Sequence, residues 1–313
     1  MVGYENDSVW KNMQVFLPVK NRISEETMPE EYYLPLNDIN IHIDHYRVSK
    51  PKATIIMFHG VGGNGRLLSF IAVRLMQNGY EVICPDLPLY GYTVYGNTEN
   101  SDKITYDTWI NCGCEMVEYY QKHNSDNIFL FGLSAGGMLA YQVANECRNI
   151  NGIIATCILD QRDSEVVKKT AANPFIAAVS KLILRTTHRI FGDFKIPMKM
   201  VANMKNIANN QDLANFLMRD LKSSGASVSL SFIHSLINPI IKVEPEAFNS
   251  CPFLLVHPGD DKWTDISLSR IFYDRLGCDK ELRILEDGGH FPVEEKALIQ
   301  LEEYCVNFLE KNI

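Results

Sequence analysis

The chain has 313 residues, and a typical domain size of about 150 residues predicts two domains or one large domain with an insertion. Hydrophobic residues make up 46% and charged residues 22%, which excludes a generally disordered chain. The formal net charge of -8 argues against a nucleic-acid-binding protein, because such proteins usually carry an excess of Lys and Arg.

Two further features of the composition bear on location and cofactors. Residues 1–7 show no basic segment before an apolar stretch, and no run approaches the ~20 apolar residues of a membrane span. Several of the 8 cysteines, such as Cys157, lie in apolar runs, so we predict reduced core cysteines in a cytoplasmic protein. Cys112 and Cys114 have no second Cys pair or His partner at zinc spacing, so we predict no metal site there.

Strand and helix patterns alternate in the first half of the chain. In residues 39–48, Ile39, Ile41 and Ile43 alternate with polar residues, which predicts a half-buried strand paired as a hairpin with residues 32–36. Continuous apolar runs are typical of strands that are buried on both faces of a parallel sheet. We therefore expect strands at 53–58, 80–84, 127–133 and 152–159, and helices at 67–77, 103–122 and 135–148.

This alternation stops at residues 161–245, where we predict three helical stripes: 175–183, 213–221 and 232–236. It resumes with strands at 252–257 and 281–286 and helices at 265–276 and 293–310. The pattern predicts an α/β fold with a mostly parallel central sheet and a helical cap insertion. We divide the chain into a core of 1–160, with an N-terminal extension of about 1–30, a cap of 161–245, and a second core part of 246–313.

The pentapeptide Gly-Leu-Ser-Ala-Gly, residues 132–136, contains the main candidate for a catalytic residue. It places Ser134 between a predicted strand and a predicted helix, where a sharp turn projects the hydroxyl above the sheet. Gly132 and Gly136 avoid the collisions that side chains would make in such a turn. The pattern predicts a nucleophilic serine.

A nucleophilic serine needs a base, and His290 lies in a Gly-rich loop directly after the last predicted strand. The loop after the preceding strand offers two carboxylates to orient that imidazole, of which we prefer Asp261 and keep Asp260 as the alternative. Asp160 is a third choice. One of the adjacent pair is expected to cap a turn or helix instead.

The oxyanion that forms during acyl transfer needs backbone N–H donors. We predict that Ala135, at the start of the helix after Ser134, supplies one donor. Residues 59–63 read His-Gly-Val-Gly-Gly, and Val61 is the second predicted donor. These glycines could instead form a plain tight turn. A phosphate-binding loop is a weaker interpretation, because no Gly-Lys-Ser/Thr ending follows them.

Together these residues resemble the α/β-hydrolase fold family over nearly the whole chain from about residue 30. Members carry His-Gly after a central strand, then Gly-x-Ser-x-Gly, an acid and a His, and Ser134, Asp261 and His290 follow in that order. Residues 86–92 are similar to the family's Asp-x-Pro-Gly-x-Gly loop, in which Asp86 is a structural residue and Leu89 replaces the usual Gly.

The pattern looks closest to the lysophospholipase and monoacylglycerol-lipase-like esterase branch, with the insertion at the position of the family's cap. His-Gly-Val-Gly-Gly departs from the His-Gly-Gly-Gly of hormone-sensitive-lipase-like esterases, which argues against activity on tertiary-alcohol esters. A Ser nucleophile also argues against haloalkane dehalogenase and epoxide hydrolase chemistry, which uses Asp. The resemblance implies ester hydrolysis through a Ser134-bound acyl intermediate, without a metal or organic cofactor.

Three functions remain open on this triad. The first is a serine esterase or lipase on a small-molecule acyl ester. The second is an acyl-CoA thioesterase, a peptidase or a cofactor-free haloperoxidase. The third is a non-catalytic ligand-binding protein, against which the complete triad argues.

The net charge is unevenly distributed along the chain. Residues 161–242 carry a formal charge of +7 and the remainder -15. One interpretation is electrostatic cohesion between the cap and the core, or a solvated face. The other is transient contact of the basic cap with anionic lipid or a membrane surface.

Overall fold

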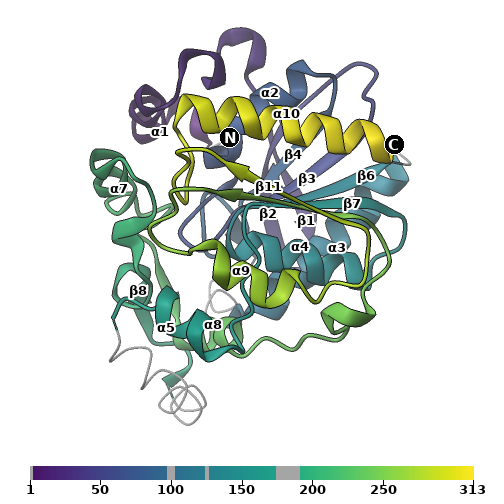
Figure 1. Ribbon diagram of the computed structural model, residues 1–313. Helices are drawn as coiled ribbons and strands as arrows, with labels where there is room; N and C mark the ends of the chain where they lie inside the picture. Colours follow the sequence, from purple (N-terminus) through teal and green to yellow (C-terminus); the bar gives the residue numbers. More distant parts are fainter. Residues whose placement is uncertain (1–2, 97–102, 124–126, 174–190) are drawn as a thin grey trace.

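The computed structural model describes residues 3–96, 103–123, 127–173 and 191–313, and a mixed sheet of nine strands forms its centre (Figure 1). The strands of this sheet are β1 (Glu30–Leu36), β2 (Ile39–Tyr46), β3 (Thr54–Phe58), β4 (Glu81–Pro85), β5 (Val94–Tyr95), β6 (Ile128–Gly132), β7 (Ile150–Ala155), β10 (Phe253–Pro258) and β11 (Lys280–Leu285). Their order is β1-β2-β4-β3-β6-β7-β10-β11, and β5 pairs with β2.

The sheet is parallel from β4 to β11, and only the pairs that involve β2 are antiparallel. Every residue of β3, β4 and β6 is buried, as expected for continuous apolar strands with helices on both faces. The mostly parallel sheet predicted from the sequence is confirmed. β7 ends at Ala155, earlier than expected, because the mostly apolar residues 156–159 continue as buried chain beyond the sheet.

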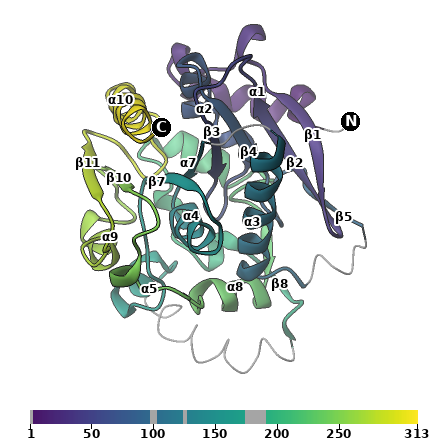
Figure 2. The same ribbon diagram turned by 90° about the vertical axis from the view of Figure 1, so that its right-hand side faces the viewer.

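Helices cover both faces of the sheet (Figure 2). The α-helices are α1 (Ser8–Met13), α2 (Ser69–Gln77), α3 (Tyr106–His123), α4 (Ala135–Glu146), α5 (Ser164–Thr170), α7 (Gln211–Leu217), α8 (Leu230–Ile237), α9 (Ile266–Tyr273) and α10 (Glu295–Asn312). Shorter 3-10 helices are η1 (Tyr4–Asn6), η2 (Gln14–Phe16), η3 (Val19–Asn21), η4 (Glu25–Thr27), η5 (Gly65–Leu68), η7 (Met198–Met200), η8 (Met204–Asn206) and η9 (Pro245–Ala247). Helices α2 and α10 pack together on one face, and α3, α4 and α9 lie on the other.

The burial of β2 differs from the prediction, because the N-terminal segment covers it. We expected β2 to be half-buried, yet His42 and Asp44 on its polar positions are both buried. They are covered because the Arg66 guanidinium pairs with Asp44 beneath the N-terminal segment, with the Tyr4 ring centroid 4.8 Å away. Polar alternation along a strand therefore did not mean exposure to solvent here, because another segment of the chain supplies charged partners.

The cap region (residues 161–245) lies beside the carboxyl ends of the strands (Figure 1). It is not purely helical as predicted, because β8 (Lys195–Pro197) and β9 (Ser227–Ser229) pair as a small antiparallel sheet. Strands of three residues are too short to produce a periodic sequence pattern. The predicted stripe at 175–183 lies wholly within residues 174–190, which are outside the described residues.

The stripe at 213–221 is also shorter than predicted. Helix α7 ends at Leu217, and Leu221 is 78% exposed. The Asp220 carboxylate accepts hydrogen bonds from the Lys222 N–H at 3.0 Å and the Ser223 hydroxyl at 2.8 Å. Such a side-chain turn competes with helix continuation. Residues 220–226 therefore form a turn, named the cap turn below.

Within the described residues, no helix has the length and apolar character needed to cross a membrane. All eight cysteines are free thiols, five of them buried.

Candidate active site

Ser134 lies at the tight turn between β6 and α4 and has φ 86° and ψ -117°, a conformation that non-glycine residues rarely adopt. The neighbouring glycines make this turn possible. A Cβ on Gly132 would lie 2.2 Å from the Gly136 carbonyl oxygen, and one on Gly136 would lie 2.2 Å from the Phe58 carbonyl oxygen. The strained backbone directs the Ser134 hydroxyl away from the sheet.

His290 lies next to that hydroxyl. The distance from Ser134 Oγ to His290 Nε2 is 2.8 Å, and the imidazole is 5% exposed. The Trp263 ring packs against it, with the ring centroids 4.6 Å apart. The Phe291 N–H donates to the Ile207 carbonyl of the cap region at 2.8 Å, which ties the histidine loop to the cap. The imidazole is therefore held in hydrogen-bond contact with the serine.

Asp261 contacts the other ring nitrogen. Its Oδ2 accepts from His290 Nδ1 at 2.8 Å, and its side chain is 1% exposed. Its Oδ1 accepts from the backbone N–H groups of Trp263 and Thr264, each at 2.8 Å. Burial alone would raise the pKa of the Asp261 carboxyl, but the His290 ring and the Thr264 donors outweigh it and lower the pKa to about 2. The group is thus an ionised, fully hydrogen-bonded carboxylate.

The other two acid candidates lie apart from the imidazole. The Asp260 side chain is 58% exposed and contacts Asn209 and Lys262. The Asp160 carboxylate is paired with the Arg162 guanidinium at 2.8 Å. The structure therefore brings together Ser134, His290 and Asp261 and leaves out the two alternatives.

Thr264 is a site residue that the sequence analysis did not identify. Its Oγ1 donates to Asp261 Oδ2 at 2.8 Å and lies 3.1 Å from His290 Nδ1. It is buried and contacts both the carboxylate and the imidazole. The Asp-x-x-Thr spacing, which is typical of a side-chain turn, is the sequence signal that points to it.

The predicted oxyanion donors lie beside the serine. Val61 and Ala135 both line the same cavity as Ser134, and among the described residues neither backbone N–H donates to an acceptor. A Cβ on Gly60 would lie 2.6 Å from the Ser134 Cβ, so glycine is required for this close approach. Two N–H donors free to face a cavity at the serine can stabilise a developing oxyanion.

His59 holds the loop that carries Val61. The Leu87 N–H donates to His59 Nε2 at 2.9 Å, so we assign the proton to Nδ1, which donates to the Gly60 carbonyl at 2.8 Å. Complete burial lowers the pKa of His59 to about 4, and the ring is neutral near pH 7. A second donor, the Gly63 N–H, reaches the same carbonyl at 3.0 Å.

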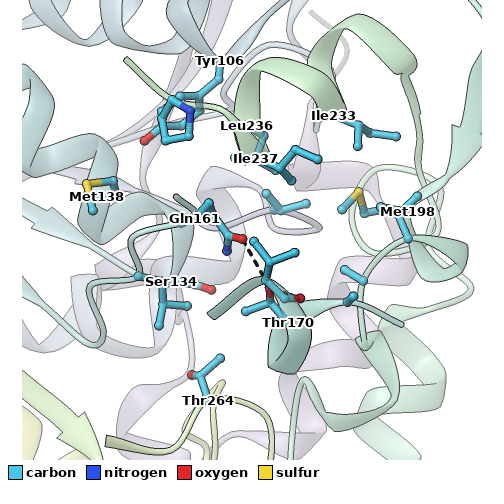
Figure 3. A pocket seen from close by; sticks show the side chains of 18 of the residues that line it. Tyr106, Ser134, Met138, Gln161, Thr170, Met198, Ile233, Leu236, Ile237 and Thr264 are labelled. Atoms are coloured by element: carbon cyan, nitrogen blue, oxygen red, sulfur yellow. Dashed lines mark hydrogen bonds between the residues drawn. The ribbon is translucent and has the colours of Figure 1, made fainter. Parts of the chain in front are cut away.

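A large cavity opens beside Ser134 and contains about 900 Å³ of space, part of it open to solvent (Figure 3). Side chains from α8 and η7 of the cap region form one wall, among them Ile233, Leu236 and Met198. Most of the lining is apolar. Its polar side chains are Tyr106, Ser134, Gln161, Thr170 and Thr264.

A second, smaller cavity of about 370 Å³ also has Ser134 in its wall. It includes His290 and Phe291, and Leu217 of the cap region contributes to its wall. His290 lines this smaller cavity and not the larger one. The two cavities at the serine therefore differ in size and in access to the imidazole.

One cluster among the described residues has the composition of a metal site. Ligand atoms of Glu31, His42 and Asp44 lie within 4.8 Å of one another. The Arg66 Nη2 lies 2.9 Å from Glu31 Oε1 and 2.8 Å from Asp44 Oδ1, so a cation already occupies the cluster. None of these residues lines either cavity, and we assign the cluster a structural role.

Comparison with known proteins places the chain among hydrolases. A family model described as "Serine aminopeptidase, S33" (Hydrolase_4) matches residues 49–297. An uncharacterised abhydrolase domain-containing protein of Dictyostelium discoideum is 24% identical over 272 residues, which cover 84% of this chain. The chain spans 27% of the length of that relative.

Solved structures share the fold. A soluble variant of monoglyceride lipase from Saccharomyces cerevisiae, bound to a substrate analogue, has a TM-score of 0.76 and 18% identity and covers 95% of this chain and 98% of its own. Monoacylglycerol lipase from Paleococcus ferrophilus has a TM-score of 0.67 and 17% identity, with 87% and 99% covered. A carboxyl esterase from Bacillus coagulans has a TM-score of 0.64 and 14% identity, with 90% and 98% covered. The chain has the α/β-hydrolase fold, and it belongs to the family described as serine aminopeptidase, S33.

Proposed function

We propose that this protein hydrolyses carboxylic esters of fatty acyl chains, through an acyl intermediate on Ser134. The observation that carries the proposal is the unbroken hydrogen-bond chain from Ser134 through His290 to Asp261 beside a large apolar cavity. The named solved structures include lipases and an esterase, which supports the same reaction class.

Each residue has one role in this mechanism. The Ser134 hydroxyl attacks the ester carbonyl and His290 Nε2 takes its proton, while the Asp261 carboxylate stabilises the imidazolium. The N–H groups of Val61 and Ala135 hold the oxyanion. His290 then protonates the departing alcohol, and later it activates the water that releases the acid.

The two cavities give the substrate an orientation. The alcohol must leave beside His290, because that ring donates its proton, and His290 lines the smaller cavity. The acyl chain then occupies the larger apolar cavity, whose wall includes Met138 next to the start of α4. A long acyl chain esterified to a small alcohol, as in a monoacylglycerol or lysophospholipid, fits this division.

A peptidase function, in line with the family's description, receives less support. Recognition of a free peptide N-terminus calls for an acidic side chain near the scissile bond, and the described residues that line the two cavities include no Asp or Glu. Acyl-CoA thioesters remain chemically accessible to the same nucleophile, so a thioester belongs in the substrate panel.

Some side chains of the cap region are suited to contact with lipid, and others hold the cap to the core. Exposed apolar side chains Phe191, Phe194 and Met200 occur in the same stretch of the chain as exposed Lys199 and Lys205, a combination typical of segments that contact anionic membranes. Other basic residues of the cap pair with acidic groups outside it and serve cohesion: Lys222 with Asp7, Lys242 with Glu146, and Arg162 with Asp160. We expect the protein to float with anionic vesicles and not with zwitterionic ones.

A fluorophosphonate probe tests the nucleophile directly. We expect covalent labelling of the wild type at Ser134 and none of Ser134→Ala. Undiminished labelling of that variant would contradict the assignment. A panel of p-nitrophenyl esters from acetate to palmitate, with acyl-CoA and aminoacyl p-nitroanilides beside it, tests the substrate class, and turnover of the anilides alone would contradict ester hydrolysis.

A further inference from the structure

The cap turn (residues 220–226) packs on the loop that carries the proposed oxyanion donor Val61. Ser224 is fully buried, and its Oγ donates a hydrogen bond of 2.8 Å to the Gly62 carbonyl oxygen. Gly62 has φ 76°, and a Cβ there would lie 3.0 Å from the Ser224 Oγ. A cap residue 162 positions later in the chain is thus in direct contact with the loop at the nucleophile.

This contact completes the fixation of the loop. On the core side, the Gly60 carbonyl accepts from His59 Nδ1 and from the Gly63 N–H, which sets the plane of the Gly60–Val61 peptide. The Gly62 carbonyl is not bound by the core, and the hydrogen bond that it accepts among the described residues comes from Ser224. The Gly62 carbonyl belongs to the Gly62–Gly63 peptide, and the Gly63 N–H of that peptide donates to the Gly60 carbonyl. Ser224 of the cap therefore holds the peptide that in turn fixes the Gly60–Val61 peptide and its Val61 N–H.

The Ser224 hydroxyl is itself held in place. The backbone carbonyl of Lys222 accepts from the Gly91 N–H of the core at 3.0 Å, and Lys222 Nζ lies 3.1 Å from Asp7 Oδ2 in the N-terminal segment. The Asp220 side chain closes the turn from within. The core, the N-terminal segment and the cap therefore meet at this turn and fix its backbone. Because the turn is fixed, the Ser224 hydroxyl needs little reorganisation to bond the loop.

We propose that Ser224 is a positioning residue for the oxyanion site, so that the cap is a structural part of the catalytic machinery as well as a wall of the acyl cavity. The proposal rests on the function proposed above. Without the hydroxyl, the Gly62 carbonyl is buried without a donor, and the Gly62–Gly63 peptide rotates or shifts to regain one. The Gly63 N–H then no longer holds the Gly60 carbonyl, so the Val61 N–H of the Gly60–Val61 peptide loses its alignment with the oxyanion, which forms only in the transition state.

The test compares Ser224→Ala with Ser223→Ala in the full-length protein. Ser223 is a buried neighbour in the same turn that bonds Asp220 and does not contact the loop, so it is a matched control. For p-nitrophenyl esters we expect Ser224→Ala to lower kcat about tenfold with KM within about twofold, a part of the 100- to 1,000-fold cost of losing an oxyanion donor. The inhibition constant of a trifluoromethyl ketone, whose adduct carries an oxyanion, should rise by about the same factor as kcat falls.

The outcomes separate this inference from the proposed function. A wild type that turns over no ester, thioester or amide and takes no fluorophosphonate overturns both. An active wild type whose kcat is matched by Ser224→Ala overturns only the positioning role. An equal fall of kcat in Ser224→Ala and Ser223→Ala also overturns the positioning role, because it shows a general effect of the turn. The same holds if the fall of kcat in Ser224→Ala is matched by a loss of folded protein in a thermal scan.

Discussion

His290 Nδ1 lies 2.8 Å from Asp261 Oδ2, although the two residues occupy loops that follow different strands, β10 and β11. Because these strands are parallel neighbours, their carboxyl ends meet at one edge of the sheet, and the loops bring the two side chains together. Asp260, one residue away, points to solvent. The contact therefore depends on the loop backbone, which directs only one of the two carboxylates inward.

The first prediction follows from this contact. Asp261→Asn should lower kcat/KM for p-nitrophenyl esters by about 1,000-fold or more, because an amide neither stabilises the imidazolium nor holds the Nδ1–H tautomer. Asp260→Asn should stay within about twofold of the wild type, since its carboxylate is exposed. Steady-state kinetics of the two variants tests this prediction. A larger loss of kcat/KM in Asp260→Asn than in Asp261→Asn would contradict the assignment of Asp261.

The second prediction concerns stability at alkaline pH. Burial opposes protonation of His42, but hydrogen bonds to Asp86 and Glu31 outweigh it and raise the pKa of His42 to about 10. The folded-state pKa lies above the unfolded value of about 6.5, so protonated His42 stabilises the fold fully below about pH 6.5, and this stabilisation is lost as the pH rises through about 10.

Urea unfolding at several pH values tests this prediction. Between pH 7 and 10, the free energy of unfolding of the wild type should fall by up to about 1.4 kcal/mol per pH unit more than that of His42→Gln, because one proton is released on unfolding. The variant is less stable at pH 7, since Glu31 and Asp86 lose a charged partner. Parallel pH profiles in the two proteins would show that His42 is not protonated in the fold.

The third prediction concerns the loop after β4. Leu89 stands where the α/β-hydrolase pattern usually has Gly, and its φ of 83° is a conformation that favours glycine. Leu89→Gly should change the free energy of unfolding by less than about 1 kcal/mol, because relief of backbone strain offsets lost burial and added chain entropy. Leu87→Gly, at a fully buried position without positive φ, should cost about 3 kcal/mol or more. Equal losses in urea unfolding would show that the Leu89 backbone is not strained.

The fourth prediction concerns acyl chain length. Ile233 on α8 lines the large cavity, and Ile233→Trp should fill part of it (Figure 3). We expect kcat/KM for p-nitrophenyl palmitate to fall about tenfold or more while that for the butyrate changes little, because only the long chain needs the filled space. Ile240→Trp, at a position 71% exposed and outside the cavity lining, is the control. An equal loss for both esters would place the acyl chain elsewhere.

The sequence by itself determined the features that depend on neighbours along the chain. Buried strands read as apolar runs, and Gly132 and Gly136 around Ser134 marked the turn because glycine alone avoids the local collisions. The chain order of Ser134, Asp261 and His290 indicated the site, since the order of loops follows the order of strands. These patterns are local, so they are visible without a fold.

The tertiary structure decided what depends on contacts between distant segments. It turned Asp261 and not Asp260 toward His290, because the loop backbone sets each side chain's direction. It buried the polar side of β2 beneath Arg66 and the Tyr4 ring of the N-terminal segment. It also placed Ser224 on the Gly62 carbonyl. A hydrogen bond between residues 162 positions apart leaves no periodic trace in the sequence, since only the packed cap brings the two atoms within 2.8 Å.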